Sequence, residues 1–299
     1  MNIISQALST QGDRVEITKA VIPVAGLGTR FLPATLTIPK SMIPVLDKPP
    51  IHYCVKEASL AGIDHVVFVV SQGQESISKY FNKRTDLENI LKSRNQNVIL
   101  KTLKEIHTFA DISVVVQENQ LGLGDAILKS KKHIGSNPFA VFLPDDLIFS
   151  DQSTIKPMID IHNETGGMVL ALKHVLSEQI PNLGIADIKN NNDLIDVLQV
   201  IEKPSLENAP SNFGIIGRYI LTPNIFDAIA TSPKGILGEI QLTDAIQSLI
   251  SYTKCNGYEF PGEHFDVGTP MGMLKASIYV ALKTNETSSE LKTWLESII

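Results

Sequence analysis

Short apolar runs alternate with longer segments along the first half of the chain, and each run is bounded by Gly, Pro, Asn or Asp. Runs of this length that are rich in Val and Ile predict buried strands, and the segments between them are long enough for covering helices. We expect strands at residues 20–25, 65–70, 113–117 and 139–143. We expect helices at residues 51–61, 74–91 and 121–134. The alternation predicts a doubly wound α/β sheet, whose strand ends commonly bind nucleotides.

The pattern changes after residue 150. We expect strands at residues 167–174, 184–188, 196–202 and 213–221, and helices at 223–230, 239–251 and 270–283. Loops such as "KNNND" separate these strands, which indicates an α+β portion with more antiparallel pairing. Since no Pro- or Gly-rich linker divides the chain, residues 1–299 are expected to form one domain. Its centre would be a mixed, mainly parallel, Rossmann-like sheet with halves at 19–150 and 151–283.

Two segments stand outside this sheet pattern. Residues 85–111 are polar and lack a strand pattern, which indicates a helical insertion. Residues 284–299, around Trp294, have an amphipathic pattern and are expected to form a C-terminal helix. Either segment could carry contacts between copies of the chain, because an apolar stripe on a peripheral helix needs a partner.

Composition and charge exclude several classes of partner. Hydrophobic residues make up 43% of the chain and charged residues 19%, as in ordinary soluble globular proteins. The chain has 26 basic and 32 acidic residues, so its net charge of −6 lacks the basic excess of nucleic-acid or membrane-surface binding. The N-terminus has no basic region followed by an apolar run, so we expect no targeting signal and no membrane anchor.

The cysteines and histidines give no sign of a metal or redox centre. Cys54 and Cys255 are far apart in the sequence and are expected to be buried thiols of a protein in the reducing cytoplasm. The seven histidines show no paired metal-ligand spacing and are expected to lie in solvent or in packing positions.

A glycine-containing loop follows the first expected strand, in the stretch "KAVIPVAGLGTRFLPATLTIPKSMIPVLDKP" at residues 19–49. Glycine lets the backbone approach a ligand, and successive loop N–H groups followed by Arg30 and Lys40 could hold an anion. Neither the Walker spacing nor the complete G-x-G-x-x-G pattern is present. The alternative is a tight strand-to-helix turn with a surface arginine and a solvated loop lysine. The spacing alone leaves both interpretations open.

Carboxylates mark the ends of two expected strands. Asp145 ends an apolar strand, where open α/β sheets present groups to ligands, and a carboxylate there suits Mg²⁺. The alternative is a turn or helix-capping residue. Asp146 is expected to point elsewhere, because successive side chains on an extended chain alternate. Glu202 and Lys203 adjoin at the end of "DVLQVIEKP", although such pairs are also common on protein surfaces.

The ordered motifs together resemble those of the sugar-1-phosphate nucleotidylyltransferases, most closely the bacterial branch that uses UTP and glucose 1-phosphate. After the N-terminal stretch, further matching motifs follow in the family's order: "QENQLGLGDAI", "AVFLPDDLI", "VIEKP", "APSNFGIIGRYIL", "GEIQLTDAI" and "HFDVGTP". The resemblance covers most of the chain. It implies a nucleotide-diphospho-sugar transferase fold and commonly a homodimer or homotetramer.

The resemblance also implies a reaction. UMP would be transferred from UTP to glucose 1-phosphate in the presence of Mg²⁺, giving UDP-glucose and pyrophosphate by direct in-line attack. The sugar phosphate is then its own nucleophile, so the protein needs no Ser or Cys attacker and contributes positioning and charge neutralisation.

Residue roles follow from the same resemblance. Arg30 would neutralise the departing β and γ phosphates, and Lys40 would reach the α-phosphate. Mg²⁺ would be held by Asp145 and Asp266. The nucleotide, including its base, would be contacted by Ala25, Gly26, Leu27, Gly28, Thr29, Gln117 and Gly122. The sugar phosphate would be contacted by Gly184, Glu202 and Lys203.

Two departures from the uridylyltransferase pattern keep alternatives open. Ser41 stands where that pattern usually has glutamate, and "HFDVGTP" is more like the thymidylyltransferase form. The chain could therefore prefer dTTP, or it could be a catalytically weak paralogue that binds the same ligands and acts as a regulator. Retention of the charged site residues favours the active enzyme, because a silenced copy would be free to lose them.

Overall fold

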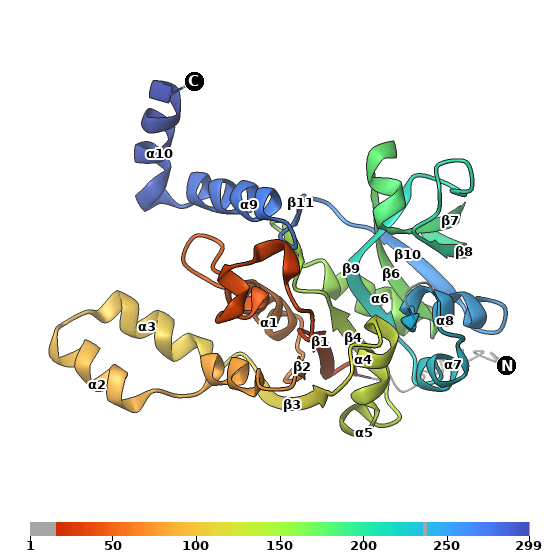
Figure 1. The fold of residues 1–299 in the computed structure, drawn as a ribbon, viewed down its shortest axis with the longest axis horizontal. Coiled ribbons are helices and arrows are strands. Elements are labelled where there is room, and N and C mark those ends of the chain that lie inside the picture. The colour runs from red at the N-terminus through yellow and green to blue at the C-terminus, as the bar shows by residue number, and fades with distance from the viewer. Residues whose placement is uncertain (1–15, 236–237, 299) are drawn as a thin grey trace, which may run out of the picture.

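The centre of the molecule is a mixed β-sheet (Figure 1), in a computed structural model that describes residues 16–235 and 238–298. Over these residues the sheet has nine strands in the order β3-β2-β1-β4-β9-β6-β10-β8-β7. These strands are β1 (Lys19–Pro23), β2 (His65–Ser71), β3 (Asp111–Gln117), β4 (Phe139–Phe142), β6 (Met168–His174), β7 (Gly184–Asn191), β8 (Leu194–Glu202), β9 (Phe213–Leu221) and β10 (Cys255–Glu259). A separate two-stranded sheet pairs β5 (Asp146–Phe149) with β11 (Glu263–Asp266).

Strand direction divides the sheet into two parts. β3, β2, β1 and β4 are parallel neighbours, whereas β9 runs antiparallel between β4 and β6. β10 runs parallel to β6 and antiparallel to β8. β8 pairs antiparallel with β7, and β7 also pairs antiparallel with β9. The expected mixed sheet with a more antiparallel second part is therefore confirmed. Backbone hydrogen bonds between β4 and β9 make the sheet continuous across both parts.

Side chains of the central strands alternate between two cores, as the pleat of a strand requires. Ala20 and Ile22 of β1 enter one core, and Val21 enters the other. Helices that contribute to the first core are α1 (Pro50–Leu60), α6 (Ile155–Thr165) and α9 (Pro270–Lys283). Helices that contribute to the second core are α4 (Leu123–Lys129), α7 (Ile225–Thr231) and α8 (Leu242–Ile250).

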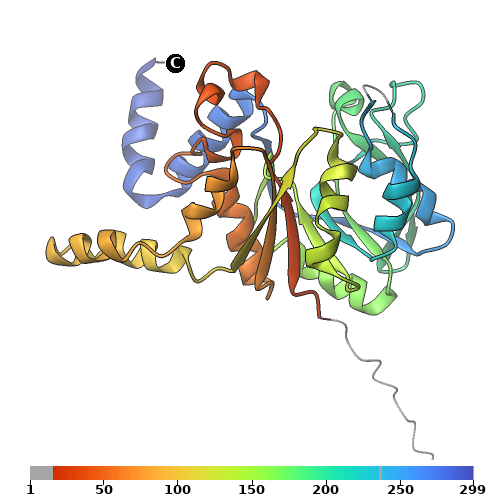
Figure 2. The same ribbon diagram turned by 60° about the horizontal axis from the view of Figure 1, so that its bottom comes forward.

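Two helical segments lie at the periphery, as the sequence predicted. α2 (Thr85–Ser93) and α3 (Asn97–Ile106) form a hairpin that projects from the sheet (Figure 2). α10 (Asn285–Ile298) follows α9 and projects near the C-terminus. The expected helical insertion and C-terminal helix are therefore both present.

The single helix expected at residues 74–91 is wrong. The chain forms a 3₁₀ segment at Glu75–Phe81, becomes extended at Asn82, and only then begins α2. The 3₁₀ segment buries Ile77 and Phe81, and the Phe81 ring stacks on Phe68 of β2 with centroids 5.7 Å apart. Packing against the sheet therefore ends this segment before the helical hairpin leaves the surface.

The helix expected at 121–134 is divided as well. α4 ends at Lys129 and is capped by Ser130, whose hydroxyl donates to the Ile127 carbonyl at 2.6 Å, and α5 (Lys131–Ile134) follows. A serine hydroxyl that donates to a helix carbonyl competes with the backbone N–H that would otherwise donate to that carbonyl in a regular helix. The sequence patterns also missed α6 and the strands β5, β10 and β11.

No helix in the described part of the chain has both the length and the apolar character needed to cross a membrane. The expected absence of a targeting signal concerns mainly residues 1–15, which lie outside the described residues. Both cysteines are buried and free, as expected.

Candidate active site

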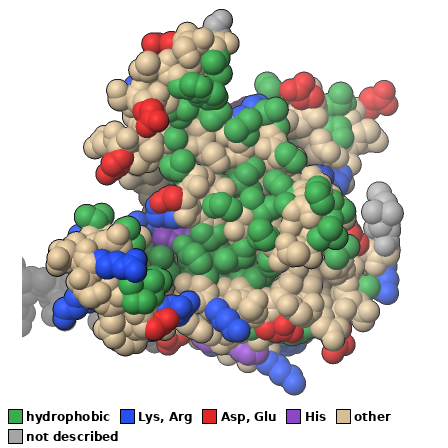
Figure 3. All heavy atoms as spheres, turned by 60° about the vertical axis from the view of Figure 1, so that its left-hand side comes forward, with side chains coloured by type: hydrophobic (Ala, Val, Ile, Leu, Met, Phe, Trp, Pro, Cys, Tyr) green, Lys and Arg blue, Asp and Glu red, His purple; other side chains and the backbone are tan. Residues whose placement is uncertain are grey.

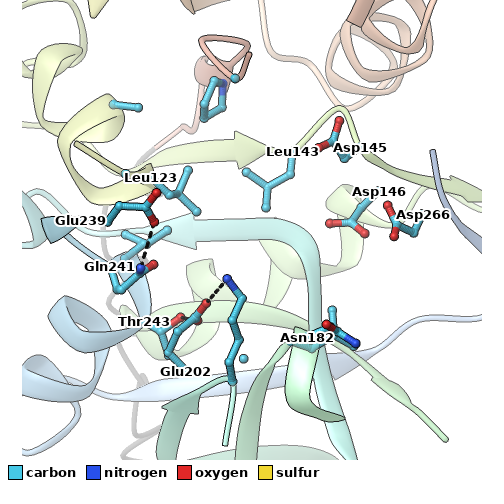
Figure 4. A pocket seen from close by; sticks show the side chains of 18 of the residues that line it. Leu123, Leu143, Asp145, Asp146, Asn182, Glu202, Glu239, Gln241, Thr243 and Asp266 are labelled. Atoms are coloured by element: carbon cyan, nitrogen blue, oxygen red, sulfur yellow. Dashed lines mark hydrogen bonds and ion pairs between the residues drawn. The ribbon is translucent and has the colours of Figure 1, made fainter. Parts of the chain in front are cut away.

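A pocket of about 840 Å³ opens where the carboxyl ends of the parallel strands meet the second part of the sheet (Figure 4). Loops of the first part, including residues 26–30, line one end, and β7, β8 and the start of α8 line the other. Every residue expected to bind substrate or metal lines this pocket except Lys40. Lys40 lines an adjoining cavity of about 70 Å³ together with Asp145, which borders both spaces.

The loop after β1 has the backbone conformation that its glycines predict. Gly28 has φ +65°, and a Cβ there would lie 2.9 Å from the Thr35 side chain and 3.0 Å from the Lys40 Cβ. The Thr35 hydroxyl donates to the Gly28 carbonyl at 2.9 Å and fixes the turn. Arg30 follows on the exposed side, with no hydrogen bond or ion pair to any described residue. Its guanidinium is therefore available to a ligand.

Lys40 and Asp145 form an ion pair, with Lys40 Nζ 2.5 Å from Asp145 Oδ2. The Asp145 side chain is 41% exposed and the Lys40 side chain 19%. Loss of hydration within the pocket raises the pKa of the partly exposed Asp145, and the Lys40 ammonium counteracts this rise. The pair brings together a cation and an anion from segments 105 residues apart.

A second carboxylate lies beside Asp145. A Cβ on Gly268 would lie 2.8 Å from Asp266 Oδ1 and 3.2 Å from Asp145 Oδ2, so these two carboxylates flank the same glycine. The Gly268 N–H donates to Asp266 Oδ1 at 2.9 Å. Two carboxylates beside an open pocket fit Mg²⁺, which takes a few oxygen ligands from the protein and completes its shell with water and phosphate oxygens. No group of three or more potential metal ligands occurs in residues 16–235 and 238–298.

The expectation that Asp146 would point away from the site is wrong. Asp146 begins β5, pairs in register with Asp266 of β11, and lines the pocket. Its Oδ1 lies 2.7 Å from Nε2 of His264. The short two-stranded sheet turns Asp146 back toward Asp266 (Figure 4), which a simple extended chain would not do.

The turn that carries Asp145 and Asp146 rests on a buried arginine. Arg218 is 1% exposed and donates twice to Glu57 Oε2, at 3.0 and 2.8 Å. Its Nη1 donates to the Asp146 carbonyl at 2.9 Å and to the Leu143 carbonyl at 3.3 Å. Burial disfavours the charged guanidinium, but the Glu57 carboxylate keeps the pKa of Arg218 above its ordinary value. The pair thus holds the backbone on both sides of Asp145.

The opposite end of the pocket carries Glu202 and Lys203. Glu202 Oε2 accepts from the Thr243 hydroxyl at 2.6 Å, and its Oε1 lies 3.4 Å from Lys203 Nζ. A Cβ on Gly184 would lie 3.4 Å from Glu202 Oε2 and 3.3 Å from both the Thr243 hydroxyl and Ile215 Cδ1. Lys203 has φ +45°, and its N–H donates to the Leu183 carbonyl. The backbone is therefore held in an unusual conformation that aims a lysine at the pocket.

Gln117 and Gly122 lie together in the part of the pocket that is lined by the first half of the chain. Gln117 ends β3, and its Nε2 donates to the Gly122 carbonyl at 3.2 Å. Gly122 has φ +95°, and a Cβ there would lie 2.8 Å from the Ile240 carbonyl. Only glycine fits this close approach between the start of α4 and the segment before α8.

Several pocket residues were missed from the sequence. They are Gln120, Asp146, Asn182, Glu239, Gln241, Thr243 and His264. Most of them come from loops or from the first residues of helices, where the sequence does not distinguish a polar residue in a pocket from a polar residue on the surface. The motif "GEIQLTDAI" contained a signal, because it supplies Glu239, Gln241 and Thr243 to one wall.

Comparison with known proteins identifies the family of this chain. The family model described as "Nucleotidyl transferase" matches residues 19–282. The chain belongs to the nucleotidyl transferase family. Among curated members, the UTP--glucose-1-phosphate uridylyltransferase of Staphylococcus epidermidis strain RP62A is 42% identical over 284 residues, covering 95% of this chain and 99% of the relative. A Staphylococcus saprophyticus relative, named UTP--glucose-1-phosphate uridylyltransferase 2, is also 42% identical, covering 95% and 98%.

Solved structures of nucleotidyl transferase family members are similar in fold. A UDP-glucose pyrophosphorylase complexed with UDP-glucose superposes with a TM-score of 0.81 at 37% identity, covering 90% of this chain and all of that one. A UTP-bound UDP-glucose pyrophosphorylase from Acinetobacter baumannii gives a TM-score of 0.87 at 34% identity, covering 95% of this chain and all of that one.

Proposed function

We propose that this chain transfers UMP from UTP to glucose 1-phosphate, giving UDP-glucose and pyrophosphate. The observation that carries the proposal is one pocket with the Arg30 loop and the Lys40–Asp145 pair at one end and Glu202 with Lys203 at the other. Two phosphorylated substrates can therefore meet between them. The 42% identity to named uridylyltransferases over 95% of the chain supports the choice of substrates.

In the proposed reaction, an oxygen of the sugar phosphate attacks the α-phosphorus of UTP. The new oxygen–phosphorus bond forms as the bond to the β-phosphate oxygen breaks, and pyrophosphate leaves with that electron pair. No protein nucleophile takes part, so catalysis depends on alignment and on stabilising negative charge. Lys40 lies beside Asp145 and would stabilise charge at the α-phosphate, and Arg30 would bind the departing phosphates.

We propose Mg²⁺ as the cofactor, held by Asp145 and Asp266. When bound, the cation supplies positive charge to the phosphate oxygens of the nucleotide. Asp145 also holds the Lys40 ammonium, so one carboxylate orients two groups that carry positive charge. The Arg218–Glu57 pair keeps the backbone of this turn in place.

At the other end, Lys203 would bind the phosphate of glucose 1-phosphate and Glu202 would accept hydrogen bonds from sugar hydroxyls. Thr243 occupies one oxygen of Glu202, which fixes the carboxylate and leaves Oε1 beside Lys203. A charged acceptor bonds hydroxyls strongly, and an ammonium is a compact partner for phosphate. The absence of a side chain at Gly184 keeps room for the sugar next to Glu202.

The first test is pyrophosphate release with glucose 1-phosphate and Mg²⁺, comparing UTP with dTTP and including an EDTA control. We expect rapid release with UTP that EDTA abolishes. Faster release with dTTP would instead assign thymidylyl transfer. Binding of UTP without release from either nucleotide would contradict the proposed activity and support the regulatory paralogue.

We propose that the protein acts in the cytoplasm as a homodimer or homotetramer. Two buried free thiols suit a reducing compartment. Figure 3 shows hydrophobic side chains gathered on the face between the α2–α3 hairpin and α10. Exposed hydrophobic residues of α9 and α10 are Met271, Leu274, Trp294 and Ile298. An exposed apolar surface beside two projecting helical segments suits a second copy of the chain.

We also propose that residues 19–150 bind the nucleotide and residues 151–283 the sugar phosphate, within a single domain. The continuous β4–β9 pairing supports this division into halves rather than into separate domains. Substrates would then bind across the seam between the halves.

A further inference from the structure

The side-chain amide of Gln117 is locked by two acceptors. Its Nε2 donates to Asp125 Oδ2 at 2.8 Å and to the Gly122 carbonyl at 3.2 Å. Gln117 is 4% exposed and Asp125, in the first turn of α4, is 6% exposed. The sequence drew attention to Gln117 but not to its partner.

The chemistry of these partners fixes which way the amide faces. A carboxylate and a backbone carbonyl only accept hydrogen bonds, whereas the amide NH₂ only donates. Flipping Gln117 would set its oxygen against both acceptors, in a buried place where the lost bonds are costly. Nε2 therefore faces Asp125, and Oε1 is left as the free polar atom of Gln117, with no donor bonded to it among the described residues.

The neighbouring backbone supplies the complementary group. Within residues 16–235 and 238–298, no acceptor bonds the N–H of Gly122, which also lines the pocket. This wall of the pocket thus offers an acceptor from Gln117 and a donor from Gly122. A base with an imide N–H beside a carbonyl, such as uracil, presents the matching donor and acceptor. Cytosine presents a ring nitrogen acceptor beside an amino donor, which is the reverse pattern.

We propose that Asp125 is a specificity-determining positioning residue, which selects imide bases over cytosine by fixing the orientation of the Gln117 amide. Asp125 does not touch the base in this role; it acts through Gln117. The inference rests on the proposed nucleotidyl transfer and deepens it.

The test compares the wild-type chain with Asp125→Asn, which keeps the shape of the side chain but can present either a donor or an acceptor to Gln117. We would measure kcat/KM for UTP, dTTP and CTP with glucose 1-phosphate and Mg²⁺. The ratio of UTP to CTP should fall about tenfold in the variant, because a neutral amide bonds the Gln117 NH₂ less strongly than a carboxylate does and no longer fixes which atom of Gln117 faces the base. The ratio of UTP to dTTP should stay unchanged, since both bases carry the imide.

Two further variants make the result decisive. Asp160→Asn, on the exposed face of α6, makes the same chemical change away from the pocket and should keep the wild-type ratio. Gln117→Met should lower the UTP to CTP ratio by itself, and adding Asp125→Asn to it should cause no further fall. If Asp125→Asn unfolds, as checked by thermal denaturation, Asp125→Ser is measured in the same two backgrounds, because its hydroxyl can also either donate or accept a hydrogen bond.

A fall of the UTP to CTP ratio by threefold or more in Asp125→Asn, absent in the Gln117→Met background, supports the inference. A smaller change in folded Asp125→Asn, or an equal fall in both backgrounds, overturns it. If the wild-type chain releases no pyrophosphate with any nucleotide, the proposed function fails instead, so the two failures are distinguishable.

Discussion

Asp145 contacts the Lys40 ammonium on one side and faces Asp266 across Gly268 on the other. Replacing it with asparagine keeps the volume but removes the charge that pairs with Lys40 and that would hold the proposed Mg²⁺. We expect Asp145→Asn to lower kcat by on the order of 10²-fold to 10³-fold, as for other groups that stabilise charge in a transition state. Steady-state rates across a range of Mg²⁺ concentrations would measure this, with Asp151→Asn on an exposed loop as the matched control. Unchanged kcat and unchanged Mg²⁺ dependence would remove Asp145 from the mechanism.

Lys203 lies at the opposite end of the pocket and should affect a different parameter. Its side chain is half exposed and its ammonium lies 3.4 Å from Glu202 Oε1, so a sugar phosphate could replace water around the ammonium. We expect Lys203→Ala to raise KM for glucose 1-phosphate about 10-fold to 100-fold, with a smaller effect on kcat, because a bond to a charged phosphate is lost. Lys189→Ala, on the exposed part of β7, is the control. A larger effect on KM for UTP than on KM for glucose 1-phosphate would show that Lys203 lies at the nucleotide end of the site and not at the sugar-phosphate end.

His52 makes the stability of the fold depend on pH. The imidazole is buried among Tyr53, Tyr80 and Phe109, and this burial, with Lys48 and Lys56 nearby, lowers the pKa of His52 to about 4. The unfolded chain takes up a proton here near pH 6.5, and the folded chain does so only near pH 4. The neutral His52 therefore contributes its full stabilisation above pH 6.5. As the pH falls from 6.5 to 4, the free energy of unfolding decreases by about 3 kcal/mol through this residue.

The variant His52→Phe should lose less stability than the wild type between pH 6.5 and pH 4. Urea unfolding at several pH values gives the free energy of unfolding for both proteins. Parallel pH profiles in this window would show that His52 contributes nothing to acid sensitivity.

Only some of the residues in the site could be found from the sequence. The loop at 26–30 and Asp145 could be singled out because they follow apolar strands and have chemistry suited to a ligand, whereas the Glu202–Lys203 pair was assigned to the site only through the resemblance to the family. Arg218 and Glu57 do not, since their meaning depends on a contact between residues 161 positions apart. A buried ion pair of this kind is visible only once the two segments are folded together.

The elements that support the site depend on close backbone contacts. Gly217 of β9 has φ +43°, and a Cβ there would lie only 2.4 Å from the Asp146 Cβ at the start of β5. Gly217→Ala should therefore destabilise the protein by about 3 kcal/mol or more, combining backbone strain with overpacking. Activity should fall further than stability explains, because the displaced strand carries Asp146. Urea unfolding and kcat of the folded fraction measure the two effects.

Gly166→Ala is the matched control for this variant. Gly166 has φ +69°, but a Cβ there would meet nothing within 4 Å. It should cost only about 1–2 kcal/mol, the penalty of a left-handed conformation, and should leave kcat unchanged. Equal costs at both positions would mean that the contact with Asp146 is unimportant.

At the level of elements, periodicity found the long, strongly apolar strands and most of the helices. It missed β5 and β11, because four residues each are too few to show a pattern and their pairing joins positions more than a hundred residues apart. It also joined the 3₁₀ segment Glu75–Phe81 to α2, since both present apolar residues at helical spacing. Packing of Phe81 on the sheet, which sequence does not display, decides that boundary.

The assembly of the whole molecule can be tested on the apolar face near α9 and α10. The double variant Leu274→Asp with Trp294→Asp places charge on two exposed hydrophobic positions of these helices. If this face joins copies of the chain, light scattering after size-exclusion chromatography should show a lower mass than for the wild type. Tyr252→Asp, in the exposed turn after α8, is the control and should leave the mass unchanged. An unchanged mass in the double variant would contradict a role of this face in assembly, and the α2–α3 hairpin would be the next surface to test.

Backbone hydrogen bonds between β4 and β9 run through the middle of the molecule, beneath the pocket. Swinging one half away from the other would break these bonds, so continuous strand pairing disfavours a hinge at the seam. The loop from Gly26 to Arg30 and the 3₁₀ turn at Ser177–Asn182 both line the pocket at the surface of the molecule. Substrates and products would therefore enter and leave past these two segments rather than through a separation of the two halves.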